Sequence, residues 1–236
     1  MKKIINIDDW SRKNTYKKFC DFDNPYTGIT TTLNITNLLQ LVENTNNSFY
    51  GTMLYFVLMS LDKVDAFKYG YGKDEKNILQ ICKYDDIAAT VTVLNESSEL
   101  NFTRYIKFNA NYEEFIREFC VVKGDAENNV EYYKISNQDN MNKVQVTCLP
   151  WVKFNSFKDA TTKSEKSSKP KICWGKYYKI NNEYFIDFSL LVNHAFQDGI
   201  HIAMLINELQ NNILNIKSES LTKEFKYVKT KKKNNV

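Results

Sequence analysis

The sequence predicts an α+β fold, a two-layer α/β sandwich in which a mixed β-sheet has helices packed on one side. Strand-like segments follow one another without strict β–α–β alternation, which favours a mixed sheet over a doubly wound one. Segments in which apolar residues recur at helical spacing lie between the strands. The length of 236 residues and the apolar content of 43% suit one domain with a substantial core. We expect that domain to span 1–225, followed by a basic tail at 226–236.

Three helices are expected in the first half of the chain. Thr36 is positioned to cap a short amphipathic helix. Residues 53–67 are apolar almost throughout, which is typical of a buried helix. Asn111 and Glu114 have the spacing of a capping box at the start of a third helix. The apolar faces of the first and third helices are Leu38, Leu39, Leu41 and Val42, and Tyr112, Phe115, Ile116 and Phe119.

Strands are predicted where side chains alternate in polarity or are rich in β-branched and aromatic residues. The expected strands are 28–35, 77–83, 88–94, 101–108, 143–154, 171–180 and 184–194. The last two flank Asn181 and Asn182, which favour a hairpin turn because asparagine tolerates positive φ. Between 143–154 and 171–180, residues 159–169 are polar and without periodicity, and we interpret them as a surface loop.

A strand-to-helix corner is predicted at the end of the last strand. Alternation puts Ile186, Phe188, Leu190 and Val192 on one face and Asp187, Ser189 and Asn193 on the other. Beyond Gly199, the apolar residues Ile202, Ile206, Leu209 and Ile213 recur at helical spacing. The corner holds His194 and His201, the only two histidines of the chain. A partly buried imidazole at such a corner suits a base that works near neutral pH.

Charge and cysteine content restrict the classes of function. The net charge of +4 depends on five lysines in the last eleven residues, a pattern we interpret as a solvated terminus rather than a nucleic-acid site. Five scattered cysteines without a Cys-x-x-Cys pair argue against disulfides and zinc and favour a reducing compartment. The acidic start and the short apolar runs favour neither a signal peptide nor a membrane span. We therefore expect a cytoplasmic protein.

Four segments carry a resemblance to a known family. They are IDDWSRK at 7–13, LPWVKFNSF at 149–157, GKYY at 175–178 and HAFQDGIH at 194–201, which runs into NELQ at 207–210. In this order and at this spacing the chain resembles the trimeric chloramphenicol acetyltransferases over nearly its full length. The His-x-x-x-Asp-Gly core alone is weaker, because other acyl-CoA-dependent transferases share it.

The resemblance implies the fold of the CoA-dependent acyltransferases and a homotrimer with active sites at subunit interfaces. It implies direct transfer of acetyl from acetyl-CoA to a hydroxyl of a small molecule, with chloramphenicol as one candidate acceptor and with no metal. His194 would be the general base, which is worth roughly 10²–10⁴-fold in rate. Asp198 would pair with Arg12 to hold the shape of the site, with Gly199 in the same turn.

The chain also departs from the family. Thr147 stands where the family has a serine that donates to the oxyanion, and Asn193 where another histidine is common. Cys173 replaces a threonine and Phe19 a pocket tyrosine of some members, so both are candidate substrate-binding residues. The polar loop 159–169 replaces a segment that is richer in apolar residues and lines the acceptor site in the family. The competing hypotheses are therefore the same fold with a different hydroxylated acceptor, or a catalytically impaired trimeric binding protein.

A structural role is the competing interpretation for each residue. His194 would then be a hydrogen-bonded core histidine, Arg12 a surface arginine and Thr147 an ordinary β-branched strand residue. For His201 the structural interpretation is the preferred one, because no acidic motif accompanies it.

Overall fold

The computed structural model describes residues 1–95, 98–128, 142–161 and 166–216. The expected basic tail at 226–236, the preceding residues 217–225 and residues 162–165 of the polar loop lie outside the described residues. The elements in chain order are β1 (Lys2–Ile4), a 3-10 helix (Ile7–Asp9), α1 (Lys13–Phe19), β2 (Tyr26–Asn34), α2 (Thr36–Thr45), α3 (Phe49–Lys63), a second 3-10 helix (Asp65–Lys68), β3 (Tyr69–Lys73), β4 (Leu79–Tyr84), β5 (Ile87–Asn95), β6 (Leu100–Lys107), α4 (Tyr112–Asn128), β7 (Asn142–Cys148), β8 (Lys171–Trp174), β9 (Tyr178–Ile180), β10 (Glu183–Asn193) and α5 (Gly199–Leu214).

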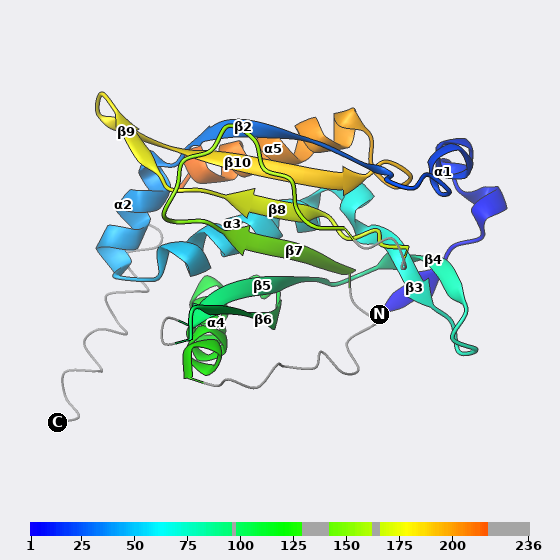
Figure 1. Ribbon diagram of the computed structural model, residues 1–236, viewed down its shortest axis with the longest axis horizontal. Coiled ribbons are helices and arrows are strands. Elements are labelled where there is room, and N and C mark those ends of the chain that lie inside the picture. The colour runs from blue at the N-terminus through cyan, green and yellow to red at the C-terminus, as the bar shows by residue number, and fades with distance from the viewer. Residues whose placement is uncertain (96–97, 129–141, 162–165, 217–236) are drawn as a thin grey trace.

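The main sheet is mixed, as the sequence predicted. Its order is β2-β10-β8-β7-β5-β6, with β9 paired to β10. The pairs β5–β7 and β7–β8 are parallel, and the other pairs are antiparallel. A small antiparallel sheet of order β1-β4-β3 lies at one end of the molecule, close to α1 (Figure 1).

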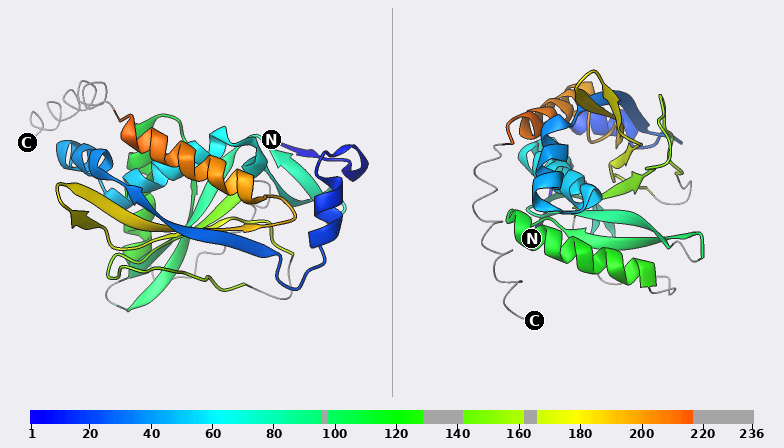
Figure 2. Two further views of the ribbon diagram at one scale, coloured as in Figure 1. Left: turned by 90° about the horizontal axis from the view of Figure 1, so that it is seen from above. Right: turned by 90° about the vertical axis from the view of Figure 1, so that its left-hand side faces the viewer.

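Helices cover one face of the main sheet, which confirms the predicted two-layer α+β class (Figure 2). The four apolar side chains expected on one face of β10 are all buried in the common core with residues of α2, α3, α4 and α5. The opposite face of β10 is polar, yet Asp187, Ser189 and Asn193 are also buried. The segment that follows β7 runs across this helix-free face, where Phe157 O accepts a hydrogen bond from Ser189 Oγ at 3.4 Å (Figure 1).

Several helix boundaries differ from the sequence predictions. Thr36 is the first residue of α2 rather than its cap, and Asn34 Oδ1 accepts from its N–H at 3.0 Å. The buried helix α3 was expected at 53–67. It begins four residues earlier, at Phe49, because Ser48 caps its start, and it also ends four residues earlier, at Lys63. An almost wholly apolar helix has little periodicity to mark its ends. At α4, Asn111 Oδ1 accepts from the Glu114 N–H at 3.1 Å, so one half of the expected capping box is present.

The strand predictions fail mainly where proline or glycine intervenes. The expected strand 143–154 ends at Cys148, just before Pro150, and 171–180 divides into β8 and β9 around Gly175. Val152 O approaches Gly175 so closely that a Cβ there would lie 2.7 Å from it, so this glycine admits the crossing segment. The predicted hairpin turn is present, with Asn181 at φ 53°.

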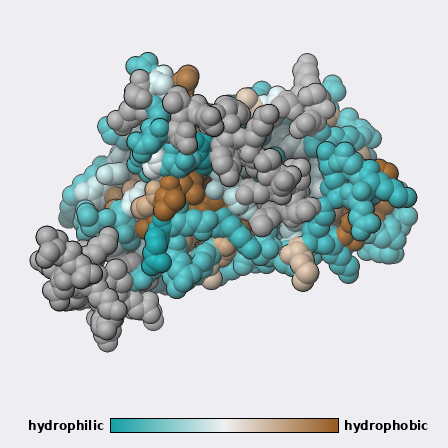
Figure 3. All heavy atoms as spheres, turned by 90° about the horizontal axis from the view of Figure 1, so that it is seen from below, coloured by the Kyte–Doolittle hydropathy of each residue, from teal (hydrophilic) through white to brown (hydrophobic). Residues whose placement is uncertain are grey.

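No helix in the described parts of the chain is long and apolar enough to cross a membrane. The face of the molecule drawn in Figure 3 is mainly hydrophilic, with hydrophobic residues gathered in separate patches.

Candidate active site

The corner between β10 and α5 fixes the backbone of His194. Asn193 ends β10, and Asp198 precedes the first residue of α5. The His194 N–H donates to Pro25 O at 2.8 Å, while Asn193 O accepts from the Phe196 and Gln197 N–H groups at 2.9 and 3.0 Å. The turn that carries the imidazole is therefore held on both sides of His194.

The His194 side chain lies between an aromatic ring and a carboxylate. Its ring stacks on Phe19 from the end of α1, with centroids 4.1 Å apart and planes 12° apart. Its Nδ1 is buried and lies 3.1 Å from Asp198 Oδ1, without the alignment of a hydrogen bond. The side chain is one-third exposed. Because Nδ1 faces inward, Nε2 is the nitrogen available to a substrate.

Arg12 and Asp198 form a two-pronged ion pair that joins the start of α1 to the start of α5. Arg12 Nη1 lies 2.6 Å from Asp198 Oδ2, and Arg12 Nη2 lies 3.0 Å from Oδ1. The hydrogen bond and charge of Arg12 lower the pKa of Asp198 against the opposing effect of burial. Asp198 also lies beside His194, so one carboxylate contacts both the loop anchor and the imidazole.

The other two residues of the corner are His201 and Gly199, and for His201 the sequence favoured a structural role. His201 Nδ1 accepts the Asp198 N–H at 2.9 Å, so His201 helps to cap α5. This bond requires the neutral Nε2–H form, and burial, followed by the charge of Arg12, lowers the pKa of His201. A Cβ at Gly199 would meet nothing within 4 Å, so the turn imposes no packing demand for glycine there.

Thr147 and Cys173 are neighbours on the central strands. They pair directly between β7 and β8, and Cys173 pairs with Ser189 of β10, so all three face the helix-free side. Cys173 is buried, and burial raises the pKa of its thiol to about 12. Cys173 therefore packs as a small neutral side chain. Thr147 is only half-buried, so its side chain remains partly exposed on the helix-free face.

One chain does not bring His194 and Thr147 together. Ser189 is two strands away from Thr147, and His194 lies five residues beyond Ser189, just past the end of β10. Strand spacing and rise put the Cα atoms of His194 and Thr147 roughly 19 Å apart. In Figure 1, β7 and β10 point toward opposite ends of the sheet, so the residues at the carboxyl ends of these two strands belong to opposite ends of the sheet.

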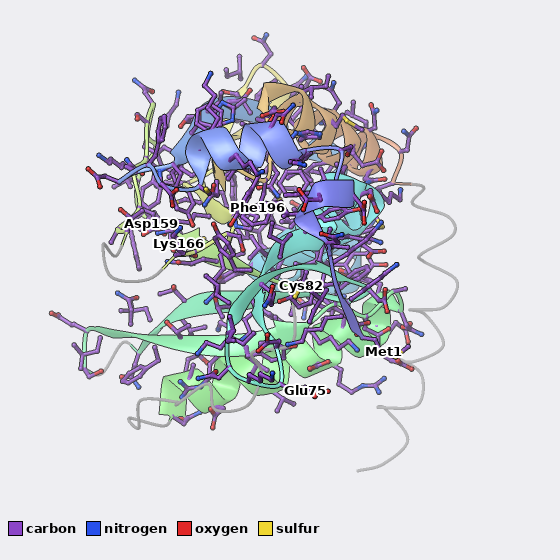
Figure 4. All side chains as sticks on the ribbon, turned by 90° about the vertical axis from the view of Figure 1, so that its right-hand side faces the viewer. Met1, Glu75, Cys82, Asp159, Lys166 and Phe196 are labelled. Carbon is purple, nitrogen blue, oxygen red and sulfur yellow. The ribbon has the colours of Figure 1, made fainter. Side chains whose placement is uncertain are left out.

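An aromatic cluster that the sequence did not locate packs around residues of the corner. Its buried members are Trp10, Ile81, Ala195 and Phe196, and the rings of Tyr16, Phe19, Tyr69 and Tyr71 pack around them. Figure 4 shows Phe196 beneath α1. The high content of tyrosine and phenylalanine was the available signal, but composition does not say which rings meet. In the described residues, no group of three or more His, Cys, Asp or Glu side chains could hold a metal ion.

Comparison with known proteins gives the class. The structure is similar to a solved chloramphenicol acetyltransferase, with a TM-score of 0.81 at 21% identity over 90% of this chain and 100% of that one. It is also similar to a probable dihydrolipoamide acetyltransferase from Listeria monocytogenes, with a TM-score of 0.61 at 14% identity over 92% and 96% of the two chains. The fold is thus that of acetyltransferases, the class that the His-x-x-x-Asp-Gly motif indicates.

The family follows from the sequence. The family model described as chloramphenicol acetyltransferase matches residues 2–210, and the chain belongs to this family. Chloramphenicol acetyltransferase of Staphylococcus aureus is 25% identical over 89% of this chain and 98% of its own length. The enzyme of Campylobacter coli is 26% identical over 88% and 96%. The protein is therefore a divergent acetyltransferase of the chloramphenicol acetyltransferase type.

Proposed function

We propose that the protein transfers acetyl from acetyl-CoA to a hydroxyl of a small molecule, with His194 as general base, in a complex that holds both substrates. One observation carries the proposal. His194 of this family member is stacked on Phe19, with Nδ1 buried beside Asp198 and Nε2 on the accessible side. An imidazole held in this way offers a single defined atom, Nε2, as a proton acceptor.

The proposed reaction needs no acyl-enzyme. His194 Nε2 accepts the hydroxyl proton of the acceptor while its oxygen attacks the thioester carbonyl carbon. The nearby Asp198 carboxylate stabilises the positive charge on the imidazole. As the tetrahedral intermediate collapses, the C–S bond breaks and the imidazolium returns its proton to the departing sulfur, which leaves as free CoA thiol.

We further propose that the site is completed by a second copy of the chain in a homotrimer. The separation of His194 and Thr147 within one chain supports this, because a base and an oxyanion donor must both lie within a few ångströms of the same acyl carbon. Thr147 of the partner subunit would then donate to the oxyanion. A single such donor is worth roughly 10²–10³-fold in rate.

The acceptor is a second part of the proposal. Chloramphenicol is one candidate, but the loop 159–169 favours a more polar hydroxylated acceptor. Asp159 Oδ2 accepts from Gln145 Nε2 at 2.8 Å and lies 3.9 Å from Lys171 Nζ, which also donates to Ala160 O. These charged and amide groups border the same helix-free face as Thr147.

We also propose that the protein is located in the cytoplasm. All five cysteines are free in the structure, which suits a reducing compartment.

The first experiment follows thiol release from acetyl-CoA with chloramphenicol and a panel of more polar alcohols. We expect His194-dependent turnover with at least one acceptor, and we expect His194→Ala to lose it by roughly 10²–10⁴-fold. Folded wild-type protein that binds acetyl-CoA and acetylates none of the acceptors would instead indicate an impaired binding protein. Full activity of His194→Ala would refute the assigned base.

Subunit mixing tests the interfacial site. The inactive variants His194→Ala and Thr147→Ala are mixed by joint refolding and assayed against each variant refolded alone. If the site joins the two residues from different subunits, about one quarter of the sites in a random equal mixture are intact, and activity returns. If both residues act from one chain, the mixture stays inactive.

A further inference from the structure

The side chain of Asn193 joins the polar loop to the turn that carries His194. Asn193 is 2% exposed at the end of β10. Its Nδ2 donates to Ser167 O at 2.8 Å, and its Oδ1 accepts from the Ala195 N–H at 2.9 Å. One buried amide thus uses its donor on the loop and its acceptor on the turn.

On the turn side, Asn193 fixes the chain immediately around His194. The bond from Ala195 closes an Asx turn, with the side-chain oxygen accepting from the residue two positions on. The backbone carbonyl of Asn193 accepts the two further bonds from Phe196 and Gln197. Loss of the Asn193 side-chain oxygen would therefore act on the direction in which the imidazole leaves the sheet.

On the loop side, the described residues 166–169 are held at several points. Ser167 O accepts a second hydrogen bond, from Tyr26 Oη at 3.3 Å, and Tyr26 pairs with Asn193 between β2 and β10. Ser168 Oγ accepts from the Tyr71 N–H at 2.7 Å. Lys166 Nζ lies 2.7 Å from Asp21 Oδ1.

We propose that Asn193 is a positioning residue that fixes His194 relative to the loop segment 166–169. The base and this segment, which borders the proposed acceptor site, then keep a constant position relative to each other. The proposal rests on the proposed function of His194. Its physical basis is that a misplacement of about 1 Å at a reacting group costs roughly 10²-fold in rate. The structure puts Asn193 and the loop in direct contact.

Three variants separate the two bonds of Asn193. Asn193→Asp keeps an oxygen for the Ala195 N–H and replaces the donor to Ser167 O with a second oxygen. Asn193→Leu removes both bonds at similar volume. Tyr26→Phe is the matched control, because it removes the hydroxyl that donates to Ser167 O, Ser167 Oγ or Lys169 O and leaves the turn unchanged. The readouts are kcat, KM for the acceptor, and amide hydrogen exchange at Tyr71 and Ala195.

We expect a different pattern from each variant. Tyr26→Phe raises KM for the acceptor roughly fivefold and leaves kcat unchanged, as the loss of one neutral hydrogen bond would do. Asn193→Asp accelerates exchange at Tyr71 while Ala195 stays protected, and raises KM more than it lowers kcat. Asn193→Leu lowers kcat by roughly 10²-fold and accelerates exchange at both amides.

The proposal is overturned if folded Asn193→Leu keeps the wild-type kcat, or if Asn193→Asp leaves exchange at Tyr71 unchanged. Should Asn193→Leu fail to fold, the Asn193→Asp and Tyr26→Phe results decide. Absence of turnover in the wild type counts against the proposed function, and the exchange pattern then decides separately whether Asn193 joins the loop to the turn.

Discussion

Removing Arg12 should loosen the corner that holds His194. In the structure, the guanidinium makes two bonds of 2.6 and 3.0 Å to Asp198, and its side chain is 15% exposed. Arg12→Ala leaves the Asp198 carboxylate beside His194 without its cation. The same carboxylate lies at the start of α5, so its movement disturbs the helix and the imidazole together.

The expected energy comes from the geometry and the exposure. Breaking a buried ion pair costs about 3–5 kcal/mol, and surface pairs contribute about 0–1 kcal/mol. The Asp198 side chain is 33% exposed, so solvent screens part of the interaction. We therefore expect a coupling between Arg12 and Asp198 of about 2 kcal/mol. At about 2–4 °C per kcal/mol for a domain of this size, Arg12→Ala should lower Tm by about 4–8 °C.

A double-mutant cycle measures this coupling. Arg12→Ala, Asp198→Asn and the double variant are unfolded in urea at pH 7 and one fixed protein concentration, since assembly affects apparent stability. Lys13→Ala is the control, because Lys13 begins the same helix and pairs with the exposed Asp8 at 2.6 Å. We expect no measurable loss of stability from Lys13→Ala.

Two results would refute this reasoning. One is a coupling below about 0.5 kcal/mol, which is the limit of ordinary additivity. The other concerns pH. Because Arg12 lowers the pKa of Asp198 in the folded state, the pair stabilises the protein above the unfolded pKa of about 3.9 and ceases to do so as pH falls through the folded value. Asp198→Asn should therefore make the acid loss of stability shallower, and an unchanged profile would contradict the ion pair.

Three further predictions concern Thr147, Phe19 and His201. Thr147→Ser should retain turnover and Thr147→Val should lose roughly 10²–10³-fold in kcat, measured by thiol release; equal rates would exclude an oxyanion role. Phe19→Ala should lower kcat/KM and Tm, because it removes the ring stacked on His194; unchanged kinetics would show that the stacking is irrelevant to the base. Burial lowers the pKa of folded His201, so the unfolded chain takes up the proton first and Tm should fall as pH drops below about 6.5. His201→Gln keeps the acceptor without titrating, so its Tm should depend less on pH in that range, and an identical profile would refute the assignment.

Local pattern predicted the elements whose two faces differ. The amphipathic spacing of α2 and α4 and the alternation in β10 were sufficient to place them, and errors were confined to their ends. The helix α1 was missed because only Tyr16 and Phe19 of its seven residues are apolar, which is too few to form a helical stripe. The strand β3 was missed because Gly70 and Gly72 interrupt the β-branched and aromatic content that marks a strand.

The sequence by itself determined the chemistry available at the corner. It provided two histidines, a strand that leads to His194 and a helix after Asp198, because these features depend on spacing along the chain. The tertiary structure decided which distant groups meet there. Arg12 and Asp198 are 186 positions apart, and only the order and register of the strands bring Phe19 and Ser167 to the same turn. The same order of β10, β8 and β7 keeps Thr147 away from His194 within one chain, because each strand adds a fixed spacing that side chains cannot span.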